Sequence, residues 1–192
     1  MNYKEKIVSD PNEQLILVDS DDNEIGYSSK SECHKDLGLL HRAFSIFLFN
    51  STGELLIQKR SIKKELWGQY WSNSCCSHPR KGEDLYEAAI RRVQQELSIE
   101  CSLNFLYKFQ YHENYTDSGS EHELCSVFYG LYDGTISCNE NEIEDWRMIS
   151  STQLNEEIGQ SNILYTPWLK LEWAEITTKY KEVIENDIGI VI

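Results

Sequence analysis

The chain has 192 residues, close to the size of a single domain, and is 40% apolar and 26% charged, a composition that excludes disorder and low complexity. Its formal net charge of -14 repels phosphate backbones, which excludes nucleic acid as an expected partner. The longest apolar stretch, residues 44–49, is far too short to cross a membrane, and six cysteines without an export signal indicate reduced thiols. We therefore expect a cytoplasmic protein without membrane contacts, either a monomer or a small homo-oligomer.

The first part of the chain predicts two β-hairpins. An apolar run at residues 14–18 is followed by the polar stretch 19–23 and by a second extended piece that ends at Tyr27. Residues 44–49 and 55–58 repeat this pattern around the turn-forming stretch 50–54. These hairpins are expected to supply the first strands of a sheet.

The rest of the chain mixes helices with further strands. Asp84 and Glu87 resemble a capping box, and apolar residues then recur every four positions, which predicts a helix with the buried stripe Leu85, Ala89, Val93 and Leu97. Strands are expected at residues 103–111, 123–132 and 146–149. Pro167 opens a final helix whose expected stripe is Leu169, Trp173, Ile176, Tyr180 and Val183. This order predicts an α/β or α+β fold, with a mixed sheet sandwiched between helices in one compact domain.

Residues 73–79 carry two thiols and an imidazole, and Pro79 predicts a loop because it disfavours helical backbone just before it. A nearby metal or cation lowers the pKa of a thiol, so Cys75 or Cys76 could perform acid–base or nucleophilic chemistry. The alternative is that both are buried, inert cysteines, a common setting for free cysteine.

Histidines and glutamates suggest a metal site. His34 and His41 are seven positions apart, which on a regular helix would separate their Cα atoms by roughly 10.5 Å, but Gly38 between them suggests a bend. With His78 they could offer three imidazoles to one divalent cation. Glu121 and Glu123 could add carboxylates, since alternate residues of a strand point to the same face. Each of these residues could instead be structural or solvated.

Two groups of charged residues suggest an anion site. Arg60, Lys63 and Lys64 form a dense basic cluster in this acidic chain, and their side chains suit phosphate oxygens, although a solvated face is the usual setting of such a run. Arg92 and Glu96 are four residues apart on the predicted helix, where an exposed ion pair is the default expectation.

Residues 82–99 resemble a Nudix box, which in its family holds Mg²⁺ against a diphosphate. Two acidic positions of the hydrolase pattern are occupied here by Arg92 and Gln95, and its later glycine by Ser98. These differences weaken the likeness to a hydrolase. Glu96 is retained as a ligand through which Mg²⁺ can hold phosphate oxygens.

Over roughly residues 12–175, these segments together resemble type I isopentenyl-diphosphate delta-isomerases. The likeness rests on the sequence Ser-Asn-Ser-Cys-Cys-Ser-His-Pro at 72–79, on His34 and His41, and on Glu-His-Glu-Leu-Cys at 121–125. It implies a Nudix-like fold with an N-terminal extension at about 1–30, a core at about 40–150 and C-terminal helices at about 151–186. It also implies interconversion of isopentenyl and dimethylallyl diphosphate through a tertiary carbocation, in isoprenoid biosynthesis.

Carried over position by position, the resemblance makes Cys76 and Glu123 the proton-transfer groups, with Tyr111 supporting Glu123 and Trp168 beside the reacting carbons. Only its offset from His78 selects Cys76 over Cys75. The resemblance implies a divalent ion (Mn²⁺, Zn²⁺ or Mg²⁺) bound by His34, His41, His78, Glu121 and Glu123. It also implies a Mg²⁺ ion that is bound together with the diphosphate. Glu96 is the expected protein ligand of this ion, and Cys76 is a further candidate ligand. The diphosphate itself is expected to contact Lys30, Arg60, Lys64, Arg92 and Ser77.

Two other functions stay open from the sequence. One is a Nudix hydrolase that cleaves a nucleoside diphosphate derivative. The other is a non-catalytic module that binds a metal or phosphate, in which Cys76, Glu121 and Glu123 would have no chemical role.

Overall fold

The computed structural model describes residues 3–117, 119–160 and 162–192. In chain order its elements are β1 (Gln14–Val18), β2 (Glu24–Ser29), α1 (Lys30–Cys33), β3 (His41–Phe49), β4 (Leu55–Arg60), β5 (Trp71–Ser72), β6 (Cys75–Ser77), α2 (Leu85–Leu97), β7 (Asn104–Thr116), β8 (Gly119–Leu131), β9 (Ile143–Ile149), α3 (Ser151–Ile158), α4 (Pro167–Glu175), the π-helix η1 (Ile176–Tyr180) and α5 (Lys181–Ile188).

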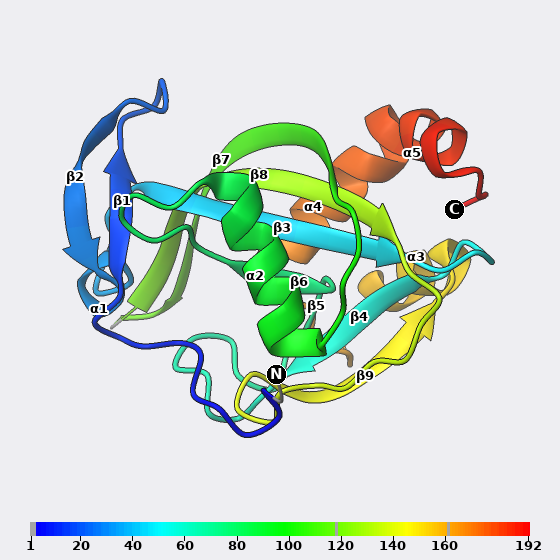
Figure 1. The fold of residues 1–192 in the computed structure, drawn as a ribbon, viewed down its shortest axis with the longest axis horizontal. Coiled ribbons are helices and arrows are strands. Elements are labelled where there is room, and N and C mark those ends of the chain that lie inside the picture. Colours follow the sequence, from blue (N-terminus) through cyan, green and yellow to red (C-terminus); the bar gives the residue numbers. More distant parts are fainter. Residues whose placement is uncertain (1–2, 118, 161) are drawn as a thin grey trace.

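The strands form a mixed sheet with β3 at its centre (Figure 1). β1, β4 and β6 pair antiparallel with β3, whereas β8 runs parallel to it along its whole length. β7 and β8 form a long antiparallel hairpin, and β9 adds to β4. The predicted mixed sheet and both N-terminal hairpins are confirmed.

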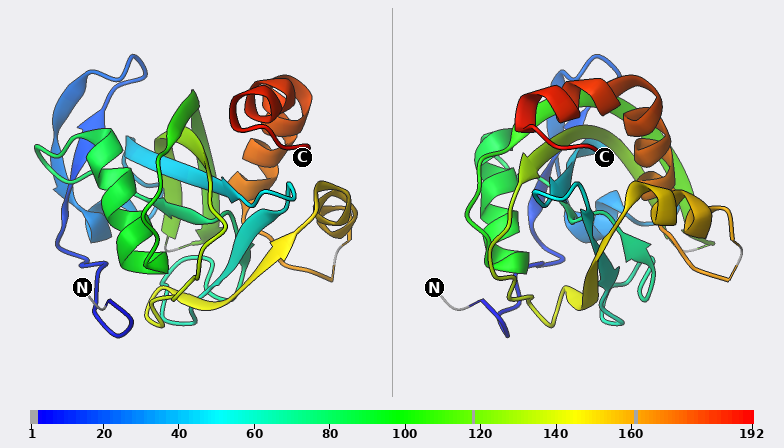
Figure 2. Two further views of the ribbon diagram at one scale, coloured as in Figure 1. Left: turned by 45° about the vertical axis from the view of Figure 1, so that its right-hand side comes forward. Right: turned by 90° about the vertical axis from the view of Figure 1, so that its right-hand side faces the viewer.

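Helices cover both faces of the sheet, because β3 is apolar on both sides. Phe44, Ile46 and Leu48 pack with α2, whereas the alternate residues Phe47 and Phe49 pack with the C-terminal helices. In Figure 1, α2 crosses in front of β3 and α4 lies behind it, and Figure 2 shows this arrangement from the side. The predicted sandwich is therefore confirmed.

Local sequence signals explain the limits of α2. The Asp84 side chain caps the helix by accepting the backbone N–H groups of Tyr86 and Glu87, at 2.9 and 3.2 Å. The helix ends at Ser98, which adopts a left-handed conformation with φ of 57°. Ser98 thus takes the backbone conformation that glycine adopts most readily.

The predicted stripe of the last helical segment is wrong at its end. Trp173 and Ile176 are buried as expected, but Val183 is 50% exposed and Ile184 is fully buried instead. The cause is the π-helical turn over Ile176–Tyr180, which inserts an additional residue into the helical repeat. The buried face therefore moves one position along the chain.

The segment predicted as a loop at residues 73–79 contains a short strand, β6, that pairs with β3. The six cysteines are free thiols, in agreement with the expected absence of a disulfide framework. Among the described residues, helices long and apolar enough to cross a membrane are not found.

Candidate active site

His34 and His41 come together because the chain reverses between them. His34 ends α1 and His41 begins β3, and Gly38 adopts a φ of 68° in the connection. A Cβ atom on Gly38 would lie 2.7 Å from Ser120 Oγ, so this close turn requires glycine. The two imidazole centroids are 4.9 Å apart, and the bend suggested by Gly38 is confirmed.

The sheet register adds the other members of a His/Glu cluster. His41 on β3 lies directly opposite Glu123 on β8, and Glu121 is two residues earlier on the same strand. His78 follows β6, with its ring centroid 4.8 Å from that of His41. One ligand atom from each of the five residues lies within 4.8 Å of all the others. The structure therefore gathers all five predicted metal ligands.

The hydrogen bonds of the cluster leave acceptor atoms facing one another. The Nδ1 atoms of His34 and His41 each lie 2.7 Å from a backbone carbonyl, of Lys30 and Leu39 respectively, which orients Nδ1–H outward and the Nε2 lone pair inward. Within the described residues, neither Nε2 atom has a hydrogen-bond partner, nor has Glu121 Oε2. His34 Nε2 nevertheless lies 2.9 Å from Glu121 Oε2. A cation between these atoms would satisfy them, so the donor set fits a divalent metal.

Burial also favours the metal-binding form of the imidazoles. It lowers the pKa of His41 to about 3, helped by the neighbouring His34. Burial and the two other imidazoles hold the pKa of His78 well below its ordinary value. Burial would raise the pKa of Glu121, but His34 and His41 lower it. Neutral imidazoles beside a carboxylate form a site that attracts a cation.

A cavity of about 170 Å³ opens beside this cluster and is lined by Cys76, Ser77 and Trp168 among others. Alternation along β6 sends the two neighbouring cysteines in opposite directions. Cys75, opposite Ile46, packs in the core under α2, whereas Cys76, opposite Ser45, faces the cavity. Of the two cysteines, only Cys76 therefore lines the cavity, an observation that does not depend on its spacing from His78.

Tyr111 and Trp168 form the wall around Glu123. Tyr111 lies opposite Glu123 in the β7–β8 hairpin, and its hydroxyl donates to Glu123 Oε2 at 2.6 Å. Trp168 stands at the start of α4, and its indole N–H lies 3.0 Å from Ser72 Oγ and 3.2 Å from Asn73 Oδ1. These bonds fix the indole with its ring centroid 6.5 Å from that of Tyr111.

Cationic side chains also line the cavity, among them Lys30, Arg60 and Lys64, and the Arg60 guanidinium lies over the Trp168 ring, 5.2 Å from its centroid. The Arg60 guanidinium donates to the carbonyls of Trp67 and Leu66, at 3.1 and 3.0 Å, and lies 3.8 Å from the Cys76 sulfur. Burial lowers the pKa of Lys30 to about 8, and the nearby Lys64 contributes. An anion bound between Lys30 and Lys64 would offset the repulsion between their positive charges.

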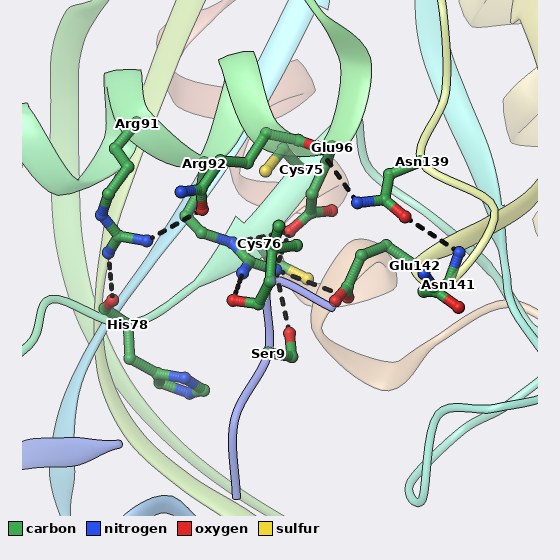
Figure 3. Close-up of polar contacts among 12 residues, drawn as sticks. Ser9, Cys75, Cys76, His78, Arg91, Arg92, Glu96, Asn139, Asn141 and Glu142 are labelled. Carbon is green, nitrogen blue, oxygen red and sulfur yellow. Dashed lines mark hydrogen bonds and ion pairs between the residues drawn. The ribbon is translucent and has the colours of Figure 1, made fainter. Parts of the chain in front are cut away.

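Arg92 and Glu96 lie outside the cavity wall, in a buried ion network (Figure 3). They are only 1% and 2% exposed, so the expectation of a surface ion pair was wrong. The Arg92 guanidinium donates to Glu96 at 2.9 Å and to Ser9 Oγ at 3.1 Å, and lies 3.4 Å from Glu142. The N-terminal segment therefore covers the helix face that periodicity alone would leave in solvent.

Several residues at the cavity were not predicted. Trp67 packs edge-on against Trp168, with ring centroids 5.3 Å apart, and Leu66 lines the cavity. The available signal was the apolar pair Leu66 and Trp67, one residue after the end of the basic cluster. Glu142 is bonded to Lys64, which is 78 positions away in sequence, so local sequence carries no signal for it.

Comparison with known proteins agrees with this geometry. The family model described as NUDIX domain matches residues 39–169. An "Isopentenyl-diphosphate Delta-isomerase 1" of Photorhabdus laumondii subsp. laumondii is 45% identical over 166 residues, covering 85% of this chain and 94% of that protein. The chain belongs to the isopentenyl-diphosphate delta-isomerase family. A second member, an "Isopentenyl-diphosphate Delta-isomerase" of Serratia proteamaculans, is 42% identical, covering 81% of this chain and 87% of the relative.

Solved structures with lower identity support the fold of this isomerase-family chain. A protein of Deinococcus radiodurans, 23% identical, superposes with a TM-score of 0.68 over 83% of this chain and 96% of that one. The MutT protein from Methanosarcina mazei, 17% identical, gives a TM-score of 0.58 over 77% of this chain and 96% of that one. The Nudix fold is thereby established.

Proposed function

We propose that the protein interconverts isopentenyl diphosphate and dimethylallyl diphosphate, with Cys76 and Glu123 as its two proton-transfer groups. The observation that carries this proposal is their shared cavity: Cys76 lies on β6 and Glu123 on β8, which flank β3 on its two edges. Moving the double bond requires a proton to be added at one carbon and another removed elsewhere. Two groups on opposite sides of one substrate can perform both steps.

The protein environment suits each group to its role. Burial raises the pKa of Cys76 to about 12, although the charge of Arg60 opposes this effect, so the sulfur carries its proton at neutral pH. Tyr111 orients the Glu123 carboxylate by donating to Oε2. The face of the Trp168 indole would stabilise a carbocation by about 0.5–2 kcal/mol.

The same cavity accounts for an anionic substrate in an acidic protein. Lys30, Arg60, Lys64 and Ser77 are proposed to hold the diphosphate, because all four line the cavity and three of them are cationic. The apolar cluster that contains Trp67, Tyr111 and Trp168 borders the cavity through Tyr111 and Trp168 and would exclude water, which would otherwise trap a carbocation. Arg92 does not line the cavity, so it would act on the diphosphate from a distance, with its charge balanced in part by Glu142.

The five His and Glu ligands are proposed to hold a divalent cation, Mn²⁺, Zn²⁺ or Mg²⁺, since one ligand atom from each lies within 4.8 Å of the others and, among the described residues, His34 Nε2, His41 Nε2 and Glu121 Oε2 have no hydrogen-bond partner. When bound, such an ion supplies charge stabilisation and fixes the orientation of the carboxylates. Glu96 is buried, bonded to Arg92 and absent from the lining of the cavity, so a Mg²⁺ ion bound by Glu96 or Cys76 together with the diphosphate would require Arg92 to release Glu96. No step of the reaction is assigned to that ion.

We further propose a cytoplasmic location and a monomer or small homo-oligomer, in isoprenoid biosynthesis. The six free cysteines support a reducing compartment.

A proton NMR time course of isopentenyl diphosphate with the purified protein and Mg²⁺ tests the activity. We expect dimethylallyl signals to appear, and chelation of divalent ions to abolish them. Release of phosphate or a monophosphate from nucleoside diphosphate derivatives, with no dimethylallyl product, would instead support the hydrolase. Unchanged spectra with both substrate classes, in protein with confirmed metal content and reduced thiols, would favour the non-catalytic module.

A further inference from the structure

Glu172 is a buried acid that the mechanism above does not use. It lies on α4, one turn after Trp168, and is 0% exposed. Among the described residues, its Oε2 atom has no hydrogen-bond partner. A carboxyl group at a core position costs stability relative to an apolar side chain, and such groups concentrate at functional sites.

Glu172 connects α4 to the strands that carry the catalytic groups. The Cys125 sulfur on β8 lies 3.6 Å from Glu172 Oε1 and 3.5 Å from Ser45 Oγ on β3. Ser45 is the cross-strand neighbour of Cys76. Cys125 is two residues beyond Glu123, about 7 Å along the strand, and packs in the cluster that contains Tyr111 and Trp168. Glu172 therefore lies directly behind the catalytic wall.

The surroundings of Glu172 disfavour a negative charge. From β8 it faces Cys125 and, further along, Glu123; from β3 it faces Ser45; and from β7 the Tyr107 hydroxyl approaches its backbone carbonyl at 3.4 Å. Among the residues that the structure describes, no lysine, arginine or histidine nitrogen lies within 4.0 Å of the Glu172 carboxylate. Burial raises the pKa of Glu172 to about 8, although Ser45 and Cys125 act in the opposite direction. At pH 7 these surroundings favour the uncharged form of Glu172.

We propose that Glu172 is a positioning residue which, in its uncharged form, holds α4 and Trp168 at the correct depth against Cys76 and Glu123. This inference rests on the proposed isomerase function. Ionisation would leave an unpaired carboxylate in the core, which the protein can relieve only by moving α4 toward water. Trp168 would move with it, so turnover falls, while diphosphate binding is retained because Lys30 and Lys64 belong to other segments than α4.

The test is the pH dependence of kcat and KM in the wild type, E172Q and E172A. In the wild type, kcat should fall above pH 8 to about one tenth by pH 9, as a single ionisation requires. E172Q cannot ionise, so it should lack this fall and keep kcat within about threefold at pH 7. Lys30 titrates in the same range, but it is proposed to bind the diphosphate, so its effect should appear in KM in both proteins.

E172A and E175Q complete the comparison. E172A should lose about tenfold or more in kcat with little change in KM, because it removes a buried contact beneath Trp168. E175Q is the matched control, since Glu175 lies on the same helix with its side chain 35% exposed and bonded to Lys179. It should behave as the wild type.

Tryptophan fluorescence provides a readout that does not depend on turnover. The wild type should show a change in emission with a midpoint near pH 8, and E172Q should not. An E172Q protein that keeps the alkaline fall in kcat, or a wild type without this emission change, would overturn the inference. If the wild type lacked isomerase turnover, the proposed function would fail, and the emission titration, compared between the wild type and E172Q, would still decide whether Glu172 ionises next to the buried tryptophans of α4. If E172A fails to fold, E172Q alone decides.

Discussion

Removing the Tyr111 hydroxyl should slow turnover with little effect on folding. In Y111F the ring is retained, so no cavity forms, but the 2.6 Å hydrogen bond to Glu123 Oε2 is lost. Burial and the neighbouring Glu121 raise the pKa of Glu123, so its charged form depends on a cation bound at the His/Glu cluster. With the cation bound, a hydrogen bond to the charged group is worth about 1.5–3 kcal/mol, which corresponds to a loss of roughly tenfold to a hundredfold in kcat. KM should change little, because the Tyr111 hydroxyl bonds Glu123 and Tyr111 is not among the residues proposed to bind the diphosphate.

Steady-state kinetics with isopentenyl diphosphate and thermal unfolding measure the two effects separately. Y129F is the matched control, since the Tyr129 hydroxyl donates to Asp187 at 2.8 Å, remote from the cavity. Y129F should keep wild-type kcat. A Y111F protein with wild-type kcat, or with its whole defect in KM, would refute the role given to Tyr111.

Three further predictions concern the cysteine pair, the π-helix and the buried ion network. C75S should destabilise the protein by about 1–3 kcal/mol yet keep its turnover, because Cys75 faces the core and not the cavity; a loss of kcat in the folded variant would contradict this. I184A should cost about 2–5 kcal/mol in urea unfolding, whereas V183A should stay within about 0.5 kcal/mol; equal losses would contradict the shift of register. Burial would raise the pKa of Glu142, but a neighbouring lysine and arginine hold it well below 4.5. Its contribution to stability should therefore be complete above pH 4.5 and be lost on further acidification, and E142Q should show a weaker loss of stability in acid.

The hydrophobic pattern carried enough information for the main layers of this fold. The repeat from Leu85 to Leu97 gave the helix that covers one face, and the apolar run at residues 44–49 gave the central strand. The pattern failed at Val183, because a π-helical turn changes the period of the helix and no residue type in Ile176–Tyr180 demands it.

The candidate site depended on signals of different kinds. The glycine between His34 and His41 suggested a bend, and the sheet register then placed Glu123 opposite His41. Arg92 was expected in solvent because helix periodicity has no information about the N-terminal segment that covers it. Glu172 did have a local signal, a charged residue between the buried Leu169 and Trp173, but its neighbours come from distant strands.

Deuterium exchange in D₂O tests the central claim, that Cys76 and Glu123 each transfer a proton at the shared cavity. Wild-type protein incubated with isopentenyl diphosphate should incorporate deuterium at both carbons that gain or lose a proton, as followed by NMR. C76S and E123Q, with folding and metal content verified, should each fall to below about one hundredth of the wild-type rate. Deuterium incorporation and product formation at the wild-type rate in either variant would contradict the account.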